Sequence, residues 1–244
     1  MNKKFEIKAH DGPGRLGKLE EIETPNVIDA NLFKVANDEA VSYNIEKEIA
    51  TWSVNKTIEK AKDFDGEIAV IQGSKYIDLR VKCLKELEKL GYSGFIIANG
   101  DDLLFRPREL ADLIITLRES MKPGSYLIFP MAEGSFIPIL SYLGIDGFLD
   151  DIGEYYSYLN VMMTATKNYD LDVYKIYEMN QEEIFTCNKN TIDFILREVR
   201  EHMKNGTLRN LVEERAATSP QNMSLLKILD HEYQDYLQKY TQLY

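Results

Sequence analysis

Apolar and polar positions alternate in two short runs near the start of the chain. The first run is FEIK (residues 5–8), and the second extends over residues 16–22. Between them lies DGPG (residues 11–14), in which glycine supplies positive φ values and proline presets its own φ, as tight turns require. The pattern predicts a β-hairpin, and the following ETP leads into a second extended run at residues 26–33.

From residue 67 the pattern becomes regular, because short apolar runs alternate with amphipathic helices. The stretch KYIDLRVKCLKELEKLGY (residues 75–92) places its apolar side chains near one side and its charges elsewhere. This alternation predicts parallel strands joined by helical crossovers. The expected strands are 67–73, 94–100, 125–130 and 145–149, and the expected helices are 75–92, 107–121 and 134–144.

Two architectures use this alternation, an open doubly wound sheet and a (β/α)8 barrel. A hairpin before the first unit favours the barrel, since such hairpins often close a barrel's bottom. The repeats end near residue 160, short of the roughly 250 residues of a full barrel. We therefore expect an α/β fold of the TIM (β/α)8-barrel type, shortened or irregular, with an N-terminal β-hairpin.

The remaining residues divide into two parts. Residues 173–187 alternate like a strand or hairpin, whereas the chain from Asn190 onward shows helical periodicity. The sequence therefore predicts a barrel domain at residues 1–189 and a tail of C-terminal helices at residues 190–244 that packs on the barrel.

The composition limits which partners the protein can bind unaided and indicates its cellular compartment. The chain of 244 residues has a net charge of −11, and an acidic protein is a poor candidate for holding nucleic acid unaided, because phosphate contacts dominate that affinity. No apolar run approaches the roughly 18 residues of a membrane span, and residues 1–20 are too charged for a signal peptide. The two cysteines, Cys83 and Cys187, cannot form a disulfide framework, so we expect a soluble cytoplasmic protein.

Several segments resemble archaeal tRNA-guanine transglycosylases, in matching order. FEIKAHDGPGRLGKLE (5–20) and IETPNVID (22–29) are similar to the hairpin and first-strand entry of that family. EIAVIQGSKYIDLR, from residue 67, is similar to its VQGG strand and the helix that follows. The segments SYLIFPMAEGSFIPILSYLGIDGFLDD (125–151) and NTIDFILREVREHMKNGTLRNLVEERAATSP (190–220) resemble its nucleophile strand and its closing helix.

The chain departs from that family in its catalytic parts. The Asp-Ser-Gly-Gly-Phe-Gln segment with one of the two catalytic aspartates has no counterpart, and residues 34–66 are far shorter than the family's region. In GIDGFLDD (144–151), an ungapped match places Leu149 at the nucleophile position, and a one-residue shift places Asp150 there. Of the family's zinc ligands only Cys187 remains, and a closed zinc site needs four ligands, so we expect no metal.

This pattern of loss resembles the shortened transglycosylase-like domain at the start of archaeosine synthase. The resemblance implies a component of archaeosine biosynthesis that is non-catalytic or needs a partner chain with the core and PUA domains. It implies tRNA as a partner through that chain, a 7-deazaguanine-type base as a candidate ligand, and no cofactor. An active tRNA-guanine transglycosylase and an unrelated small-molecule-binding α/β barrel stay open as alternatives, as do residual catalysis and homo-oligomer formation.

Four residues at expected strand ends are candidates for binding a base. Gln72 and Gly73 match the family's VQGG, in which the glutamine reads the edge of the base, and an amide can donate and accept at once. Asn99 and Gly100 end the next strand, at the edge where barrel active sites lie. For Gln72 the structural alternative is a glutamine that bonds to a neighbouring loop, and for Asn99 and Gly100 it is an ordinary solvated turn. In each case the sequence favours the structural alternative over base binding.

Asp150 and Asp151 are the candidate catalytic residues, because they end the strand that carries the nucleophile in active relatives. A carboxylate can attack an anomeric carbon and form a covalent intermediate. The structural alternative is an N-cap for the helix that begins near Glu154. The missing second aspartate favours the cap, since it leaves base exchange unsupported.

Overall fold

A five-stranded parallel sheet forms the centre of the computed structural model, which describes residues 5–29, 33–149 and 151–240. The strand order is β4-β8-β7-β6-β5, and every neighbouring pair is parallel. The strands are β4 (Asn26–Val27), β5 (Ile68–Ile71), β6 (Gly94–Ile97), β7 (Tyr126–Phe129) and β8 (Gly147–Phe148). The predicted α/β fold with parallel strands is confirmed.

The closed barrel stays a prediction. Among the described residues, the ladder of paired strands runs from β4 at one edge to β5 at the other. An isolated parallel bridge joins Val35 to Ile68 at the outer side of β5. The observed sheet is therefore compatible with a barrel-like arrangement that has fewer strands than the eight of a full barrel.

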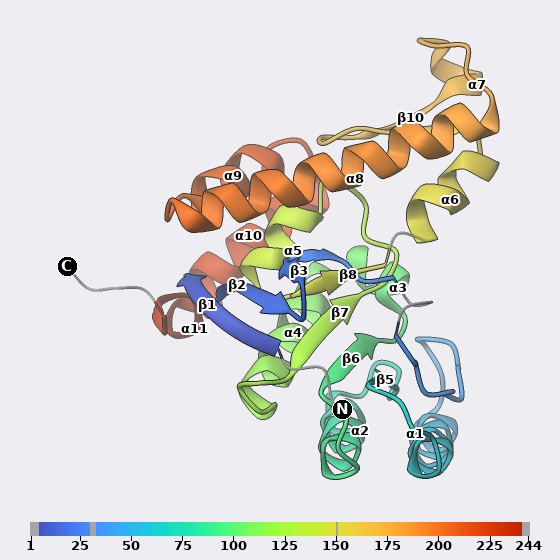
Figure 1. The fold of residues 1–244 in the computed structure, drawn as a ribbon, viewed down its shortest axis with the longest axis vertical. Helices are drawn as coiled ribbons and strands as arrows, with labels where there is room; N and C mark the ends of the chain where they lie inside the picture. The colour runs from blue at the N-terminus through green and yellow to red at the C-terminus, as the bar shows by residue number, and fades with distance from the viewer. Residues whose placement is uncertain (1–4, 30–32, 150, 241–244) are drawn as a thin grey trace.

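Helices connect successive strands of the sheet. They are α1 (Lys47–Lys62), α2 (Ile77–Lys89), α3 (Gly100–Leu104), α4 (Pro107–Ser120) and α5 (Ile137–Tyr142). Helices α1 and α2 lie side by side at one end of the molecule (Figure 1). In α2 the buried positions include Leu79, Cys83, Leu84 and Leu87, a spacing that turns one face of the helix toward the core.

The predicted N-terminal hairpin is present as β1 (Phe5–Asp11) and β2 (Gly14–Leu19), and β3 (Ile22–Thr24) adds a third antiparallel strand. Gly12 in the turn has a φ of 56°, a left-handed value that favours glycine. Gly17 has no room for a side chain, because an added Cβ would lie 2.7 Å from the carbonyl oxygen of Glu6. The glycines of this stretch thus serve the turn and the close strand pairing.

The expectation of a strand or hairpin at residues 173–187 is wrong. That segment contains the end of α7 (Leu171–Tyr174) and the first turns of the long α8 (Gln181–Lys204). Asn180 and Glu183 form a capping box, in which each side chain accepts a hydrogen bond from the other residue's backbone N–H. This cap starts a helix where local alternation suggested a strand.

The predicted C-terminal helices continue with α9 (Leu208–Ala216), α10 (Pro220–Glu232) and α11 (Gln234–Gln238). Helix α8 packs against the hairpin, and α10 packs against α4 (Figure 1). The predicted domain boundary between residues 189 and 190 lies inside α8.

The short elements α6 (Asp151–Tyr158), β9 (Val161–Met163) and β10 (Asn168–Asp170) precede α7 and lie near the start of α8 (Figure 1). Asn188 of α8 fastens them, because its Oδ1 accepts from the N–H of Met163 at 2.7 Å. No described helix is long and apolar enough to span a membrane.

Candidate functional site

The carboxyl ends of two neighbouring strands bring the predicted base-binding residues together. Gln72 and Gly73 follow β5, whereas Asn99 and Gly100 lie just beyond β6. Because β5 and β6 pair in parallel along their length, both pairs of residues leave the sheet at the same edge. This is the edge where α/β barrels and doubly wound sheets place their ligands.

Gln72 is closed off from solvent, with 2% of its surface exposed. Its Nε2 donates a hydrogen bond to Oδ2 of Asp38 at 2.5 Å, so residues 37–44, which we call the covering segment, hold the amide. Its Oε1 is buried and has no hydrogen-bond partner in the described part of the chain. Leaving a buried acceptor without a donor costs about 1–3 kcal/mol of stability. The Oε1 atom of Gln72 is therefore an acceptor that the described residues of the site leave unsatisfied.

Asn99 is bonded both to the covering segment and to α2. Its backbone is left-handed, with a φ of 58°, a conformation that asparagine tolerates better than most residues. Its Nδ2 donates to the carbonyl oxygen of Val41 at 2.9 Å, and its Oδ1 accepts from Nη2 of Arg80 at 3.3 Å. Both ends of the amide are therefore engaged within the chain.

Arg80 was not predicted from the sequence, yet it fastens these strand ends. The side chain is buried, and it donates from Nε to the carbonyl oxygen of Ser74 at 2.7 Å and from Nη1 to that of Ile71 at 3.1 Å. Burial lowers the pKa of Arg80 to about 10, so the guanidinium stays charged at neutral pH. An arginine in phase with Leu84 and Leu87 on the apolar face of a helix is the signal that could have found it.

Both glycines at these strand ends are tightly packed. Gly73 has a φ of 145°, and a Cβ added there would lie 2.6 Å from Cγ of Arg80. A Cβ at Gly100 would lie 2.9 Å from Cγ of Pro130. The two glycines therefore allow neighbouring segments of this chain to approach the strand ends closely.

Asp151 is exposed and begins α6 shortly after β8. Asp150, its predicted catalytic neighbour, lies outside the described residues. In the sheet, β7 and β6 separate β8 from β5, which places the ends of β8 and β5 roughly 14 Å apart at the usual strand spacing. The predicted catalytic and base-binding positions thus follow the same edge of the sheet without lying on adjacent strands.

A cavity of about 1200 Å³ lies elsewhere, between β9 and the first half of α8. Its lining combines apolar side chains such as Met162, Met163 and Phe194 with acidic ones such as Glu182. Cys187, at the position of a zinc ligand in the family resembled, also lines it. Within residues 5–29, 33–149 and 151–240, no group of three or more His, Cys, Asp and Glu side chains is arranged to hold a metal ion.

Comparison with known proteins places the chain among its relatives, although no family model matches it. Over 126 residues, 52% of the chain, it is 36% identical to archaeosine synthase from Methanocaldococcus jannaschii and covers 21% of that protein. Over 97% of the chain, it is 24% identical to archaeosine synthase subunit alpha from Thermococcus kodakarensis and covers 43% of it. It is also 25% identical, over 70% of its length, to 30% of the tRNA-guanine(15) transglycosylase from Methanocaldococcus jannaschii. These relatives support the resemblance of the chain to archaeal tRNA-guanine transglycosylases and to archaeosine synthase.

The transglycosylase-like segments fall on regular elements of the fold. GRLG lies in β2, IQG begins at the last residue of β5, and GIDGF leads into and through β8. The resemblance predicted from these segments is confirmed by these relatives. The chain spans between about a fifth and a half of the length of the archaeosine synthases and transglycosylases that it matches.

Proposed function

We propose that this transglycosylase-family chain is a component of archaeosine-type tRNA modification, with little or no catalysis of its own. It positions a tRNA, or a 7-deazaguanine-type base within it, for core and RNA-binding PUA domains that lie outside these 244 residues. The similarity to two archaeosine synthase alpha subunits supports this role.

The observation that carries the proposal is the internal bonding of the strand-end amides. Gln72 donates to Asp38, and Asn99 donates to Val41 while it accepts from Arg80. These contacts place the covering segment over the ends of β5 and β6, where a catalytic barrel keeps its site open to substrate. A closed edge favours a structural or positioning role over turnover.

Gln72 is the residue through which we propose that the chain retains base recognition. Its buried Oε1 has no partner in the described part of the chain, and the edge of a guanine-like base carries N–H donors that suit a carbonyl oxygen. The Nε2 group is already held by Asp38. Base binding therefore requires the covering segment to move aside, which also releases Nε2 of Gln72 from Asp38.

The net charge of −11 is consistent with phosphate contacts that come from another domain. Phosphate contacts supply most of the affinity for a nucleic acid, and they need lysine and arginine. A basic RNA-binding domain outside these residues would supply that affinity. This chain would position the tRNA or its base at the edge of the sheet.

Reconstitution tests the proposal. The chain is added to a separately produced core-plus-PUA component, and both tRNA affinity and the rate of archaeosine formation are measured. We expect the chain to increase at least one of them. Gln72→Met should reduce the increase, whereas the matched variant Gln238→Met, on the surface of α11, should leave it intact. If the chain changes neither quantity, the proposal is wrong.

Labelled-guanine exchange into tRNA tests the catalytic alternative with the same preparation. Asp151 is exposed and begins α6 shortly after the end of β8. Exchange that is lost in Asp150→Ala and kept in Asp151→Ala would assign an active transglycosylase instead.

A further inference from the structure

A second cavity lies beneath the hairpin, at the amino-terminal edge of the sheet and therefore opposite the strand ends described above. Its volume is about 350 Å³. The hairpin, the end of α4, the loop that leads into β7, and α11 form its walls. The lining residues include His10, Arg15, Arg118, Glu119, Lys239 and Tyr240.

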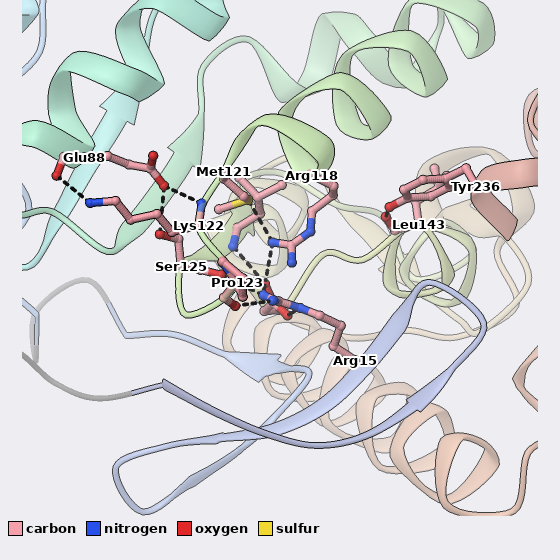
Figure 2. A network of polar contacts seen from close by, with 11 residues as sticks. Arg15, Glu88, Arg118, Met121, Lys122, Pro123, Ser125, Leu143 and Tyr236 are labelled. Carbon is pink, nitrogen blue, oxygen red and sulfur yellow. Dashed lines mark hydrogen bonds and ion pairs between the residues drawn. The ribbon is translucent and has the colours of Figure 1, made fainter. Parts of the chain in front are cut away.

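Arg15 and Arg118 line this cavity and lie close together (Figure 2). With Asp146 they form a buried triad of charges. Arg15 pairs with Asp146 through Nε at 2.8 Å and Nη2 at 2.5 Å, and it also donates to the carbonyl oxygens of Pro123 and Ser125. Arg118 reaches the same carboxylate at 3.5 Å. The triad therefore combines two positive charges with one negative charge.

Arg118 carries the excess charge. Its side chain is 9% exposed, and its single hydrogen bond to the described residues runs from Nη1 to the thioether sulfur of Met121. A thioether is a weak acceptor, so most of the guanidinium donors lack a proper oxygen acceptor. An incompletely paired buried charge costs several kcal/mol, and an anion in the cavity would offset that cost.

Other polar side chains that line the cavity include a histidine, a lysine and a glutamate. His10 stacks on Tyr240 with ring centroids 4.4 Å apart, and its buried Nδ1 has no hydrogen-bond partner in the described part of the chain. Lys239 is an exposed cation among the lining residues. Glu119 is the single acidic side chain among the described residues that line the cavity.

We propose that this cavity binds a phosphate group, held chiefly by the guanidinium of Arg118. Arginine presents a planar set of N–H donors that can bind two phosphate oxygens at once. In Arg118 most of these donors make no hydrogen bond to the described residues. A volume near the lower end of ordinary ligand pockets, about 300 Å³, suits a phosphate or a sugar phosphate. The proposal does not depend on the role in tRNA modification, because the cavity lies at the opposite edge of the sheet.

Inorganic phosphate is the probe for the test, added to the full chain in a buffer free of other multivalent anions. The chain has three histidines, so their ring signals can be resolved by NMR and assigned with single His→Gln variants. We expect a saturable shift of the His10 signals. His231, which is exposed on α10, should not move.

Arg118→Gln should weaken phosphate binding at least about tenfold. Arg108→Gln is the matched control, because Arg108 lies on the same helix, is 57% exposed and pairs with Glu232. If Arg118→Gln fails to fold, Lys239→Gln replaces it, because Lys239 lines the cavity but is exposed. We expect this variant to fold normally and to bind phosphate more weakly. Absence of a saturable His10 shift, or unchanged affinity in both Arg118→Gln and Lys239→Gln, would overturn the proposal.

Two further ligands identify the source of the phosphate. Ribose 5-phosphate represents a free phosphate ester, and a short RNA without terminal phosphates represents a nucleic-acid backbone. A larger saturable His10 shift with the first assigns a small-molecule site, and with the second it assigns a contact to RNA. A shift with neither, alongside none with inorganic phosphate, counts against the proposal.

Discussion

Arg15 and Asp146, 131 positions apart in the sequence, form a two-pronged ion pair in which both side chains are buried. The carboxylate of Asp146 also accepts the backbone N–H of Leu127 at 2.9 Å. One carboxylate thus joins β2 of the hairpin to the starts of β7 and β8. The hairpin is held to the sheet by this charge pair as well as by apolar packing.

Arg15→Met should destabilise the chain by about 3–5 kcal/mol, because it leaves Asp146 buried without its main partner. The free energy of unfolding in urea measures this loss. Arg197→Met is the control, because Arg197 is 70% exposed and pairs with Asp193 one turn away. The control should change stability by less than about 0.5 kcal/mol, and an equally small effect of Arg15→Met would contradict the prediction.

Asp38→Ala should loosen the covering segment, because it leaves Nε2 of Gln72 without an acceptor at a position with 2% exposure. We expect a loss of about 1–3 kcal/mol in the free energy of unfolding. Limited proteolysis should cut more readily within residues 37–44. Asp65→Ala is the control, since Asp65 is fully exposed and only 3.7 Å from Lys34. Equal proteolysis of the two variants would count against the prediction.

Cys83 should be unreactive in the folded chain, because its burial raises the pKa of the thiol to about 12 and the thiolate is the reactive form. At pH 8 a thiol reagent should modify Cys187, which is partly exposed, and should reach Cys83 only after unfolding. The variants Cys83→Ala and Cys187→Ala assign the signals. Rapid modification of Cys83 in the folded chain would show that the core opens readily there.

The same shift in the pKa of Cys83 gives the sign of a stability change with pH. In the unfolded chain the thiol ionises near pH 9.0, whereas in the folded chain it ionises near pH 12. The contribution of Cys83 to stability is therefore complete below pH 9 and is lost as the pH rises toward 12. Cys83→Ala should remove this part of the alkaline decline, measured by urea unfolding as a function of pH.

Asn180→Ala should remove the capping box at the start of α8 and cost about 1 kcal/mol in the free energy of unfolding. Gln181→Ala provides the control, because Gln181 is exposed at the next position and makes no contribution to the cap. Thermal unfolding monitored by circular dichroism measures both variants. Identical melting curves would mean that packing against the sheet alone holds the start of α8.

Local sequence patterns predicted the regular elements where neighbouring residues are sufficient to define them. The alternation around DGPG predicted the hairpin, and the apolar runs before Gly73 and Gly100 predicted parallel strands. Residues 173–187 were misinterpreted, because a period of two was read there while a capping box at Asn180 and Glu183 favoured a helix. Caps act through one or two hydrogen bonds, so they leave little trace in hydrophobic periodicity.

The sequence by itself determined the class of fold, the resemblance to transglycosylases and archaeosine synthase, and the strand ends at which Gln72 and Asn99 lie. Only the tertiary structure decided what those side chains contact, since Asp38 reaches Gln72 across 34 positions and Arg80 reaches Asn99 across 19. It likewise brought Arg118 toward an aspartate already paired with Arg15. The physical reason is that hydrogen bonds and ion pairs depend on where chain segments meet in space, whereas periodicity records only which face of each element is buried.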